Sequence, residues 1–172
     1  MVRALFPGTF DPIHYGHIDI ATRATRVFDE VVMAVYDKPL KSLMFTPEER
    51  MSLVNEAFKD NKKIKVTGYS GLTVEFARQI DAQVIVRGLR VFSDFEFEFR
   101  MALANHRLAE DIEIVALITA EEHTFLSSTT VKEIAMLKGD VSSMVPPHVE
   151  KAFKEKASDM DDEQSFPNSL RD

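Results

Sequence analysis

The sequence predicts an α/β fold, a Rossmann-like doubly wound parallel sheet of five strands with helices on both faces. Five short apolar, β-rich runs alternate with segments whose apolar residues recur at helical spacing, which is typical of parallel-sheet domains. The 172 residues suit one compact domain, and 45% hydrophobic with 28% charged residues is ordinary globular composition. The expected strands are residues 2–6, 31–36, 64–67, 84–86 and 112–118.

Helical patterns fill the gaps between these strands. Apolar residues from Ile20 to Phe28 form one face of a first helix. Thr46 is the expected N-cap of a second helix, with Pro47 in its first position and Glu49 completing a capping box. Gly139 is the expected C-cap of a fifth helix. The remaining helices are expected over residues 73–80, 92–108, 128–137 and 148–157.

Residues 92–108 contain a stretch that alternates apolar and polar side chains, as a strand does. Yet Phe95 and Phe99 share one helical face, and Phe97 and Met101 share another. The stretch is long and lacks internal glycine and proline, so we expect a helix. A helix with two apolar faces packs against its own sheet and a neighbouring subunit, so we also expect self-association.

Charge and cysteine content narrow the classes of function. The net charge of −7 argues against general nucleic-acid binding, but a few focused basic residues can still hold a small anion. The absence of cysteine excludes disulfides and thiol chemistry, and it fits a cytoplasmic location. We expect no signal peptide and no membrane span, because the apolar runs are too short. Residues 158–172 predict a disordered acidic tail outside a single domain of residues 1–157.

Residues 7–17, Pro-Gly-Thr-Phe-Asp-Pro-Ile-His-Tyr-Gly-His, carry the strongest functional signal. A helix start offers unpaired N–H groups and partial positive charge, which suit phosphate. Gly16 lets a phosphate approach the backbone, and His14 or His17 can donate a hydrogen bond to a transferring phosphoryl group. Capping or packing of these histidines, and metal binding with further ligands, are the alternatives.

Several polar segments follow expected strands and should meet at one edge of the sheet. Ligands of doubly wound sheets bind at the carboxyl ends of strands, near a switch in strand order. The turn after the first strand, Arg87 after the fourth and residues 119–128 after the fifth all fall at this edge. The topology therefore predicts one shared ligand site.

Two motifs resemble those of the nucleotidylyltransferase superfamily. They are His14-Tyr15-Gly16-His17 and Leu126-Ser127-Ser128-Thr129-Thr130-Val131-Lys132. The superfamily pattern is His/Thr-x-Gly-His, then Ile-Ser-Ser-Thr followed two residues later by Arg or Lys. Lys41, Phe45–Arg50 and Arg87–Arg90 further resemble the bacterial phosphopantetheine adenylyltransferase family, from about residue 2 to residue 157. The resemblance implies AMP transfer from ATP to 4′-phosphopantetheine, giving dephospho-coenzyme A and pyrophosphate in coenzyme A biosynthesis. It also implies Mg²⁺ with ATP, a homohexamer, and neither nucleic-acid nor membrane partners.

The same resemblance assigns roles to individual residues. It implies that His17 and Lys41 are catalytic and act at the α-phosphate, and it assigns no residue to a metal. ATP contacts are implied for Thr9, Phe10, His17, Gly88, Leu89, Arg90, Glu98, His123, Thr124, Phe125, Leu126, Ser127, Ser128 and Thr129. Contacts with the acceptor are implied for Thr9, Lys41, Thr73 and Arg87.

Structural roles and other functions compete with this interpretation. Arg87 and Arg90 could form salt bridges with Asp94 or Glu98, and the hydroxyls of residues 127–129 could simply cap a helix. The family often has an aromatic residue where His123 stands. A cytidylyl- or nicotinamide-mononucleotide adenylyl-transferase, and a non-catalytic nucleotide-binding module, are the alternative functions.

Overall fold

The computed structural model describes residues 1–37 and 43–164, with side chains to residue 158. Its centre is a sheet of five strands, all parallel, in the order β3-β2-β1-β4-β5. This order confirms the predicted doubly wound α/β fold. The strands are β1 (Arg3–Gly8), β2 (Glu30–Tyr36), β3 (Ile64–Tyr69), β4 (Val84–Leu89) and β5 (Glu113–Ile118).

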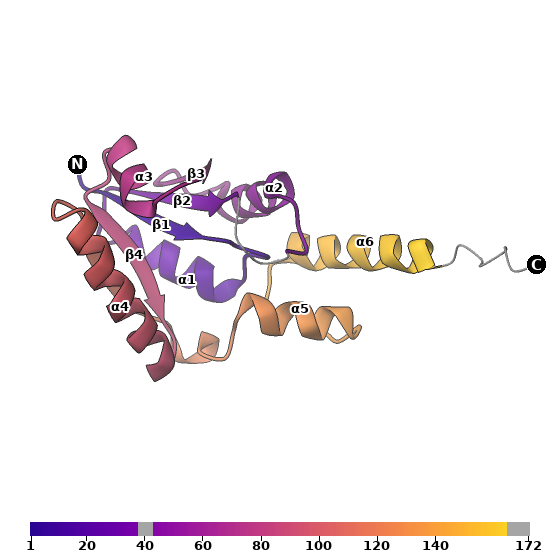
Figure 1. The fold of residues 1–172 in the computed structure, drawn as a ribbon. Helices are drawn as coiled ribbons and strands as arrows, with labels where there is room; N and C mark the ends of the chain where they lie inside the picture. Colours follow the sequence, from indigo (N-terminus) through magenta and orange to yellow (C-terminus); the bar gives the residue numbers. More distant parts are fainter. Residues whose placement is uncertain (38–42, 165–172) are drawn as a thin grey trace, which may run out of the picture.

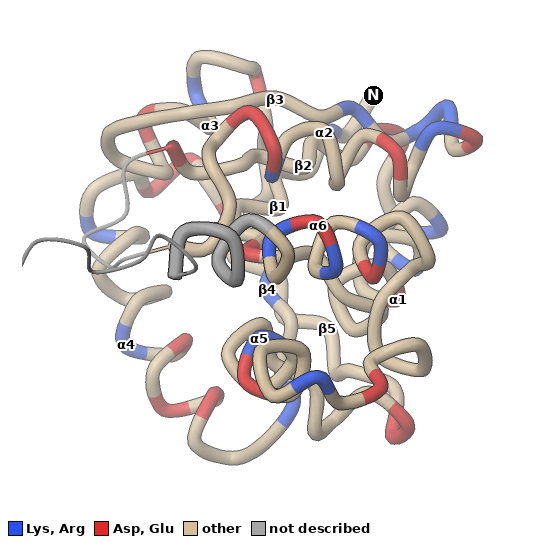
Figure 2. Tube along the Cα trace, turned by 90° about the vertical axis from the view of Figure 1, so that its right-hand side faces the viewer, with Lys and Arg blue, Asp and Glu red and all other residues tan. Residues whose placement is uncertain are grey.

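Helices cover both faces of the sheet (Figure 1). They are α1 (Tyr15–Ala24), α2 (Pro47–Phe58), α3 (Thr73–Gln79), α4 (Phe92–Leu108), α5 (Ser128–Met136) and α6 (Pro147–Gln164), with a short 3₁₀ helix, η1 (Glu121–His123). Figure 1 shows α6 extending away from the body of the molecule toward the C-terminus, and Figure 2 shows acidic and basic residues interspersed along it. Within the described ranges, no helix is long and apolar enough to cross a membrane.

Alternating side chains of the central strands build two apolar layers. In β1, Ala4 and Phe6 join the layer under α1, α2, α5 and α6, whereas Leu5 joins the layer under α3. Strand β2 divides its side chains in the same way, so its interior is buried on both faces. This burial explains why the central strands read as continuous apolar runs.

The predicted start of α2 is confirmed by its hydrogen bonds. Thr46 Oγ1 accepts a hydrogen bond from the Glu49 N–H at 3.2 Å, and the Glu49 carboxylate accepts one from the Thr46 N–H at 2.8 Å. Pro47 occupies the first turn, where no N–H is needed.

Several predicted boundaries differ from the structure. Strands β1 and β3 continue to Gly8 and Tyr69, and α1 ends at Ala24, so Phe28 of the predicted apolar face lies beyond the helix. Strand β4 continues beyond residue 86, because its pairing with β5 extends to Leu89 and Ile118. Arg87 therefore lies within β4 rather than after it. Helix α6 continues past the expected end at residue 157 to Gln164, so the first part of the predicted tail is helical, whereas residues 165–172 lie outside the described part.

The prediction that Gly139 caps α5 was wrong. The C-cap is Leu137, and Lys138, with a φ of 60°, adopts the left-handed conformation that ends the helix. The Gly139 N–H donates to the Ile134 carbonyl at 2.9 Å. A Cβ at Gly139 would lie 2.7 Å from Ile134 Cγ2, so glycine is required there for close approach.

Residues 92–108 form helix α4, as expected, and none of them is buried in the single chain. Phe92, Phe95 and Phe99 stack along one side, with ring centroids 6.2 and 5.9 Å apart, and are 85, 50 and 54% exposed. Exposed aromatic surface of this extent is unusual on a monomer and typical of an interaction surface.

Candidate active site

A cavity of about 350 Å³ opens at the carboxyl ends of β1 and β4. This is the point where the strand order reverses, because the chain runs from β1 to β2 and β3 on one side and returns to β4 on the other. The cavity is lined by Phe6, Pro7, Gly8, Thr9, Phe10, His14, Gly16, His17, Ile20, Arg87, Gly88, Arg90, Asp94, Glu98, Thr119, Ser127, Ser128 and Thr129. Residues from both sequence motifs therefore face one space.

Two histidines at the N-terminus of α1 line this cavity and form hydrogen bonds with the backbone of the helix start. His14 is the N-cap, and its Nδ1 accepts a hydrogen bond from the Gly16 N–H at 3.1 Å. The His14 N–H donates to His17 Nδ1 at 3.3 Å. Each ring nitrogen that accepts has no proton, so both imidazoles carry their proton on Nε2.

The His17 ring is held on two sides. His14 stacks on it with centroids 3.7 Å apart, and Phe10 meets it edge-to-face at 5.0 Å. Burial, then His14, Arg90 and Arg87, hold the pKa of His17 well below its usual value. Burial, assisted by Arg90, lowers the pKa of His14 to about 3. Both rings are therefore neutral near pH 7, and His17 is fixed as a hydrogen-bond donor.

The turn between β1 and α1 depends on an unusual backbone conformation. Phe10 is buried, with a φ of 50° in the left-handed region that non-glycine residues seldom adopt. Its ring lies over Gly8, where a Cβ would be 2.7 Å from Phe10 Cζ. Gly8 therefore leaves room for the aromatic ring that supports His17.

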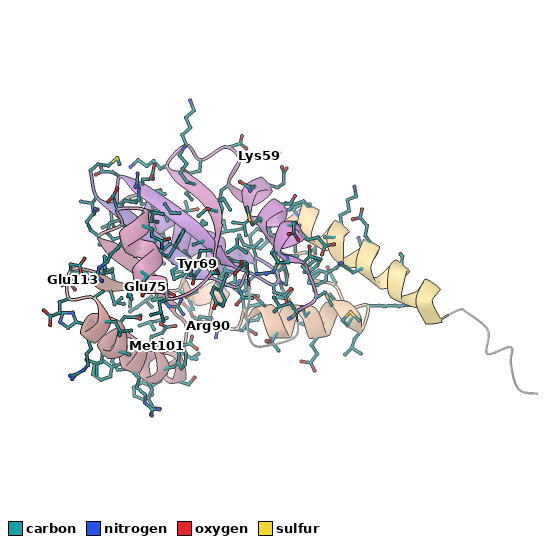
Figure 3. The ribbon with its side chains drawn as sticks, turned by 45° about the horizontal axis from the view of Figure 1, so that its top comes forward. Lys59, Tyr69, Glu75, Arg90, Met101 and Glu113 are labelled. Carbon is teal, nitrogen blue, oxygen red and sulfur yellow. The ribbon has the colours of Figure 1, made fainter. Side chains whose placement is uncertain are left out.

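Two arginines flank the cavity, and each forms an ion pair with a carboxylate of α4. Arg87 donates through Nε and Nη2 to the two Glu98 oxygens at 2.7 and 2.5 Å. Arg90 bonds to both oxygens of Asp94, and its Nη1 donates to the Leu126 carbonyl at 2.6 Å. Figure 3 labels Arg90. The salt bridges that the sequence offered as an alternative to ligand binding therefore form. A phosphate bound here must share the arginines with these carboxylates or displace the carboxylates from them.

The N-terminus of α5 forms the opposite wall. Ser127 Oγ accepts a hydrogen bond from the Thr130 N–H at 3.0 Å, so this serine is the N-cap. Ser128 Oγ donates to the Pro12 carbonyl at 2.9 Å and thereby ties the second motif to the first. The first turns of α1 and α5 contain no acidic residue, so both helix starts suit an anion.

A buried ion pair makes a second link between the motifs. Lys132 Nζ lies 2.6 Å from an oxygen of Asp11, which is 1% exposed. Asp11 also accepts the Met44 and Phe45 N–H groups, the latter at 2.9 Å. Lys132 of the second motif thus neutralises a carboxylate of the first turn and faces it rather than a ligand.

The structure brings most of the predicted site residues together. Those lining the cavity are Thr9, Phe10, His17, Arg87, Gly88, Arg90, Glu98, Ser127, Ser128 and Thr129. Those outside its lining are Leu89, His123, Thr124, Phe125 and Leu126. The His123 ring is parallel to that of Tyr15, at a centroid distance of 6.4 Å. Lys41 lies outside the described residues.

Thr73 lines a second cavity, of about 210 Å³, which adjoins the first. The two cavities share Pro7, Arg87 and Glu98, while Met101 and Asn105 of α4 line the second alone. Thr73 Oγ1 lies 3.1 Å from the Tyr69 hydroxyl. The Arg87–Glu98 pair thus lines both cavities.

His14, which the sequence offered with His17 as a possible donor to a phosphoryl group, also lines the cavity, as does Asp94, to which the sequence assigned only a possible salt bridge. The spacing of Asp94, four residues after Arg90 at a helix start, is the sequence signal that places these two side chains together. The mutual bonding of His14 and His17 across the start of α1 was detectable as a capping-box spacing with unusual residues.

Comparisons with known proteins agree with this geometry. Residues 5–134 match the model of the cytidylyltransferase-like family. The phosphopantetheine adenylyltransferase of Desulfitobacterium hafniense (strain Y51) is 50% identical over 89% of this chain and 94% of its own length. That of Roseiflexus sp. (strain RS-1) is 51% identical over 90% of this chain and 96% of its own.

A solved structure from Vibrio parahaemolyticus, described as a nicotinate-nucleotide adenylyltransferase, has the same fold. It superposes with a TM-score of 0.68 at 21% identity and covers 90% of this chain and 99% of that chain. The chain belongs to the cytidylyltransferase-like family. The relatives that it matches at about 50% identity place it, within that family, among the phosphopantetheine adenylyltransferases.

Proposed function

We propose that this chain transfers AMP from ATP to 4′-phosphopantetheine and releases pyrophosphate, forming dephospho-coenzyme A for coenzyme A biosynthesis. The observation that carries the proposal is the convergence of two anion-suited helix starts, those of α1 and α5, on one cavity beside Arg87 and Arg90. The named relatives at about 50% identity supply the nucleotide and the acceptor.

The reaction needs no side-chain nucleophile. An oxygen of the acceptor phosphate forms a bond to the α-phosphorus of ATP, and the bond from that phosphorus to the bridging oxygen breaks as pyrophosphate leaves. The acceptor phosphate is already ionised near neutral pH, so no general base is required. The protein acts by positioning the reactants and stabilising charge.

His17 is the proposed donor to the α-phosphate. Its Nδ1 is occupied by the His14 N–H, so Nε2 offers a proton in a fixed direction. Its lowered pKa keeps the ring neutral, so His17 stabilises charge by a hydrogen bond and does not transfer its proton. Lys41 is the second proposed catalytic group and would neutralise charge on the same phosphate.

The remaining contacts follow from the two helix starts and the arginines. We assign the leaving pyrophosphate to Arg90 and to the N–H and hydroxyl groups of Ser127–Thr129. Arg87 is assigned to the acceptor phosphate, because it lines both cavities. The second cavity, which Thr73 lines, suits the pantetheine arm.

Mg²⁺ is the proposed companion of ATP. In the described part of the chain, no group of three or more His, Asp or Glu side chains could hold a metal ion. The ion would therefore be held mainly by nucleotide phosphates and water, as Mg²⁺ often is, and it would neutralise phosphate charge.

A homohexamer in the cytoplasm is the proposed state of the protein. The stacked, exposed Phe92, Phe95 and Phe99 on α4 support a contact between subunits. Sedimentation of the wild-type chain, with a subunit mass of 19.5 kDa, should give six times this mass. Phe95→Glu should yield smaller species, whereas Val27→Glu, at an exposed position off α4, should not. Equal assembly of both variants would contradict this surface.

The function is tested by mixing the protein with ATP and Mg²⁺, with and without 4′-phosphopantetheine. We expect pyrophosphate release that depends on the acceptor, together with dephospho-coenzyme A as product. ATP binding without product for this acceptor would overturn the assignment while leaving the phosphate site intact.

A further inference from the structure

Arg50, in the first turn of α2, is completely buried, which is rare for an arginine. It does not line either cavity described above. Burial lowers the pKa of its guanidinium, while the nearby carboxylates of Asp11 and Asp37 raise it. The chain therefore keeps a cation in its interior, next to the phosphate turn but out of reach of a ligand in the cavity.

The Arg50 guanidinium binds backbone carbonyls from three separate segments. Nη1 donates to the Thr9 carbonyl at 2.7 Å and to the Tyr36 carbonyl at 2.8 Å. Nε donates to the Phe45 carbonyl at 3.2 Å. One side chain thus joins the turn after β1, the end of β2 and the residue before the N-cap of α2.

The contact with Thr9 sets the direction of a donor in the cavity wall. The C=O and N–H of one planar trans peptide point in opposite directions. When the Thr9 carbonyl points inward to Arg50, the N–H of Phe10 points away from it. Thr9 and Phe10 both line the cavity. The bond therefore orients the peptide at the turn that a phosphate would meet.

The backbone of Phe45 is held at both its N–H and its carbonyl. Its N–H donates to Asp11 Oδ1 at 2.9 Å, and its carbonyl accepts from Arg50. Asp11 belongs to the same turn as Thr9. The turn after β1 and the start of α2 are therefore joined both by Asp11 and by Arg50. Among the described residues, Arg50 Nη2 and Asp37 Oδ1 lack a hydrogen-bond partner. Burying a cation with an unpaired donor costs free energy, so stability alone does not explain why an arginine stands here.

We propose that Arg50 is a positioning residue for adenylyl transfer, which holds the Thr9–Phe10 peptide in the orientation that receives the transferring phosphate. This inference rests on the proposed function for its kinetic consequence. Arg50 acts through the Thr9 carbonyl and does not touch substrate. Loss of the Arg50 guanidinium should shift the turn after β1 by up to about an ångström. A shift of this size in an active site lowers kcat more than it weakens substrate binding.

Arg50→Lys and Arg50→Met test the proposal, with Val54→Ala as the matched control. Val54 lies four residues further along α2 and is equally buried, so its truncation destabilises the same helix without removing a hydrogen bond to the turn. We expect kcat to fall about tenfold in Arg50→Lys and about a hundredfold in Arg50→Met. The Kd for ATP should change by less than about threefold, and Val54→Ala should retain wild-type kcat per folded molecule.

Amide hydrogen exchange over residues 7–13 gives a readout that does not need activity. Exchange should be faster in both Arg50 variants than in the wild type and Val54→Ala. A wild-type chain without acceptor-dependent activity would refute the proposed function, and exchange at the turn would still decide the role of Arg50. Unchanged exchange at the turn, or kcat in both Arg50 variants equal to that of Val54→Ala, would overturn the positioning role.

Discussion

Helices α1 and α2 both begin with an N-cap side chain that accepts a backbone N–H and an N3 side chain that accepts the N–H of the N-cap, but the residues differ in charge. In α2 the N-cap and its partner three residues later are Thr46 and Glu49. In α1 the corresponding residues are His14 and His17. The first turn of α2 contains two acidic residues, whereas that of α1 contains none.

The difference is whether the partial positive charge at the helix N-terminus is already neutralised by acidic residues of the chain. Glu48 and Glu49 neutralise the partial positive charge of α2 with the chain's own carboxylates. The start of α1 is capped by neutral imidazoles, so its partial charge remains available to an anion in the cavity. Capping geometry alone therefore does not identify a binding site, but capping by uncharged buried groups beside a cavity does.

The largest expected effect comes from His17→Ala. The variant removes the proposed donor to the α-phosphate, so we expect kcat to fall about 10²- to 10³-fold with little change in ATP affinity. Glu49→Ala is the matched control, because it removes the equivalent N3 acceptor from α2. Kinetics at saturating substrates and calorimetric titration with ATP would check both. Equal turnover in wild type and His17→Ala would remove the catalytic role of His17.

A smaller effect is expected on the free energy of unfolding when the pH is lowered. The pKa of His14 is about 3 in the folded chain and about 6.5 when unfolded, so below pH 6.5 the unfolded chain binds a proton that the folded chain does not. His17 is shifted in the same direction. The free energy of unfolding should therefore decline as pH falls from 6.5 toward 4.5, by up to about 1.4 kcal/mol per pH unit for each histidine.

Denaturant titrations of His14→Asn isolate this contribution. Asparagine keeps an N-cap acceptor but cannot titrate, so the decline with falling pH should become shallower by about one proton. Val27→Asn, at an exposed position off α4 with no titratable side chain, should leave the slope unchanged. Identical slopes in both variants would show that His14 is not buried in the neutral form.

The smallest effect is expected from Glu49→Ala. It removes the acceptor for the Thr46 N–H and an ion pair with Lys156 of α6, whose Nζ lies 2.8 Å from a Glu49 oxygen. The free energy of unfolding should fall by about 1 kcal/mol, as for other helix caps. Thermal unfolding monitored by circular dichroism would measure it, and kcat should not change. A large loss of activity would mean that the two helix starts do not have separate roles.

Much of the fold was predictable because periodicity and capping chemistry are local. The alternation of strands and helices and the Thr46–Glu49 box all follow from neighbouring residues. The end of β4 was not, because its last residues are held by pairing with β5 across the sheet. The end of α5 was not either, since Lys138 rather than Gly139 takes the left-handed conformation.

The site was predictable in its position but only in part in its internal bonding. Sheet topology and the two motifs indicated a shared edge, and the cavity lies there. Salt bridges of Arg87 and Arg90 with Glu98 and Asp94 were predicted as an alternative, and they form, but the convergence of three backbone carbonyls on Arg50 was not predicted. The contacts of Arg50 with Thr9 and Tyr36 join separate segments of the chain, and no local pattern encodes them.

Rates with two nucleotides and two acceptors distinguish adenylyl transfer to 4′-phosphopantetheine from other nucleotidyl transfers. Initial rates of pyrophosphate release would be compared for ATP and CTP, each with 4′-phosphopantetheine and with nicotinamide mononucleotide. We expect rapid release for ATP with 4′-phosphopantetheine and far slower release for the other three pairs. Faster release with CTP or with nicotinamide mononucleotide would contradict it and assign the same site to another nucleotidyl transfer.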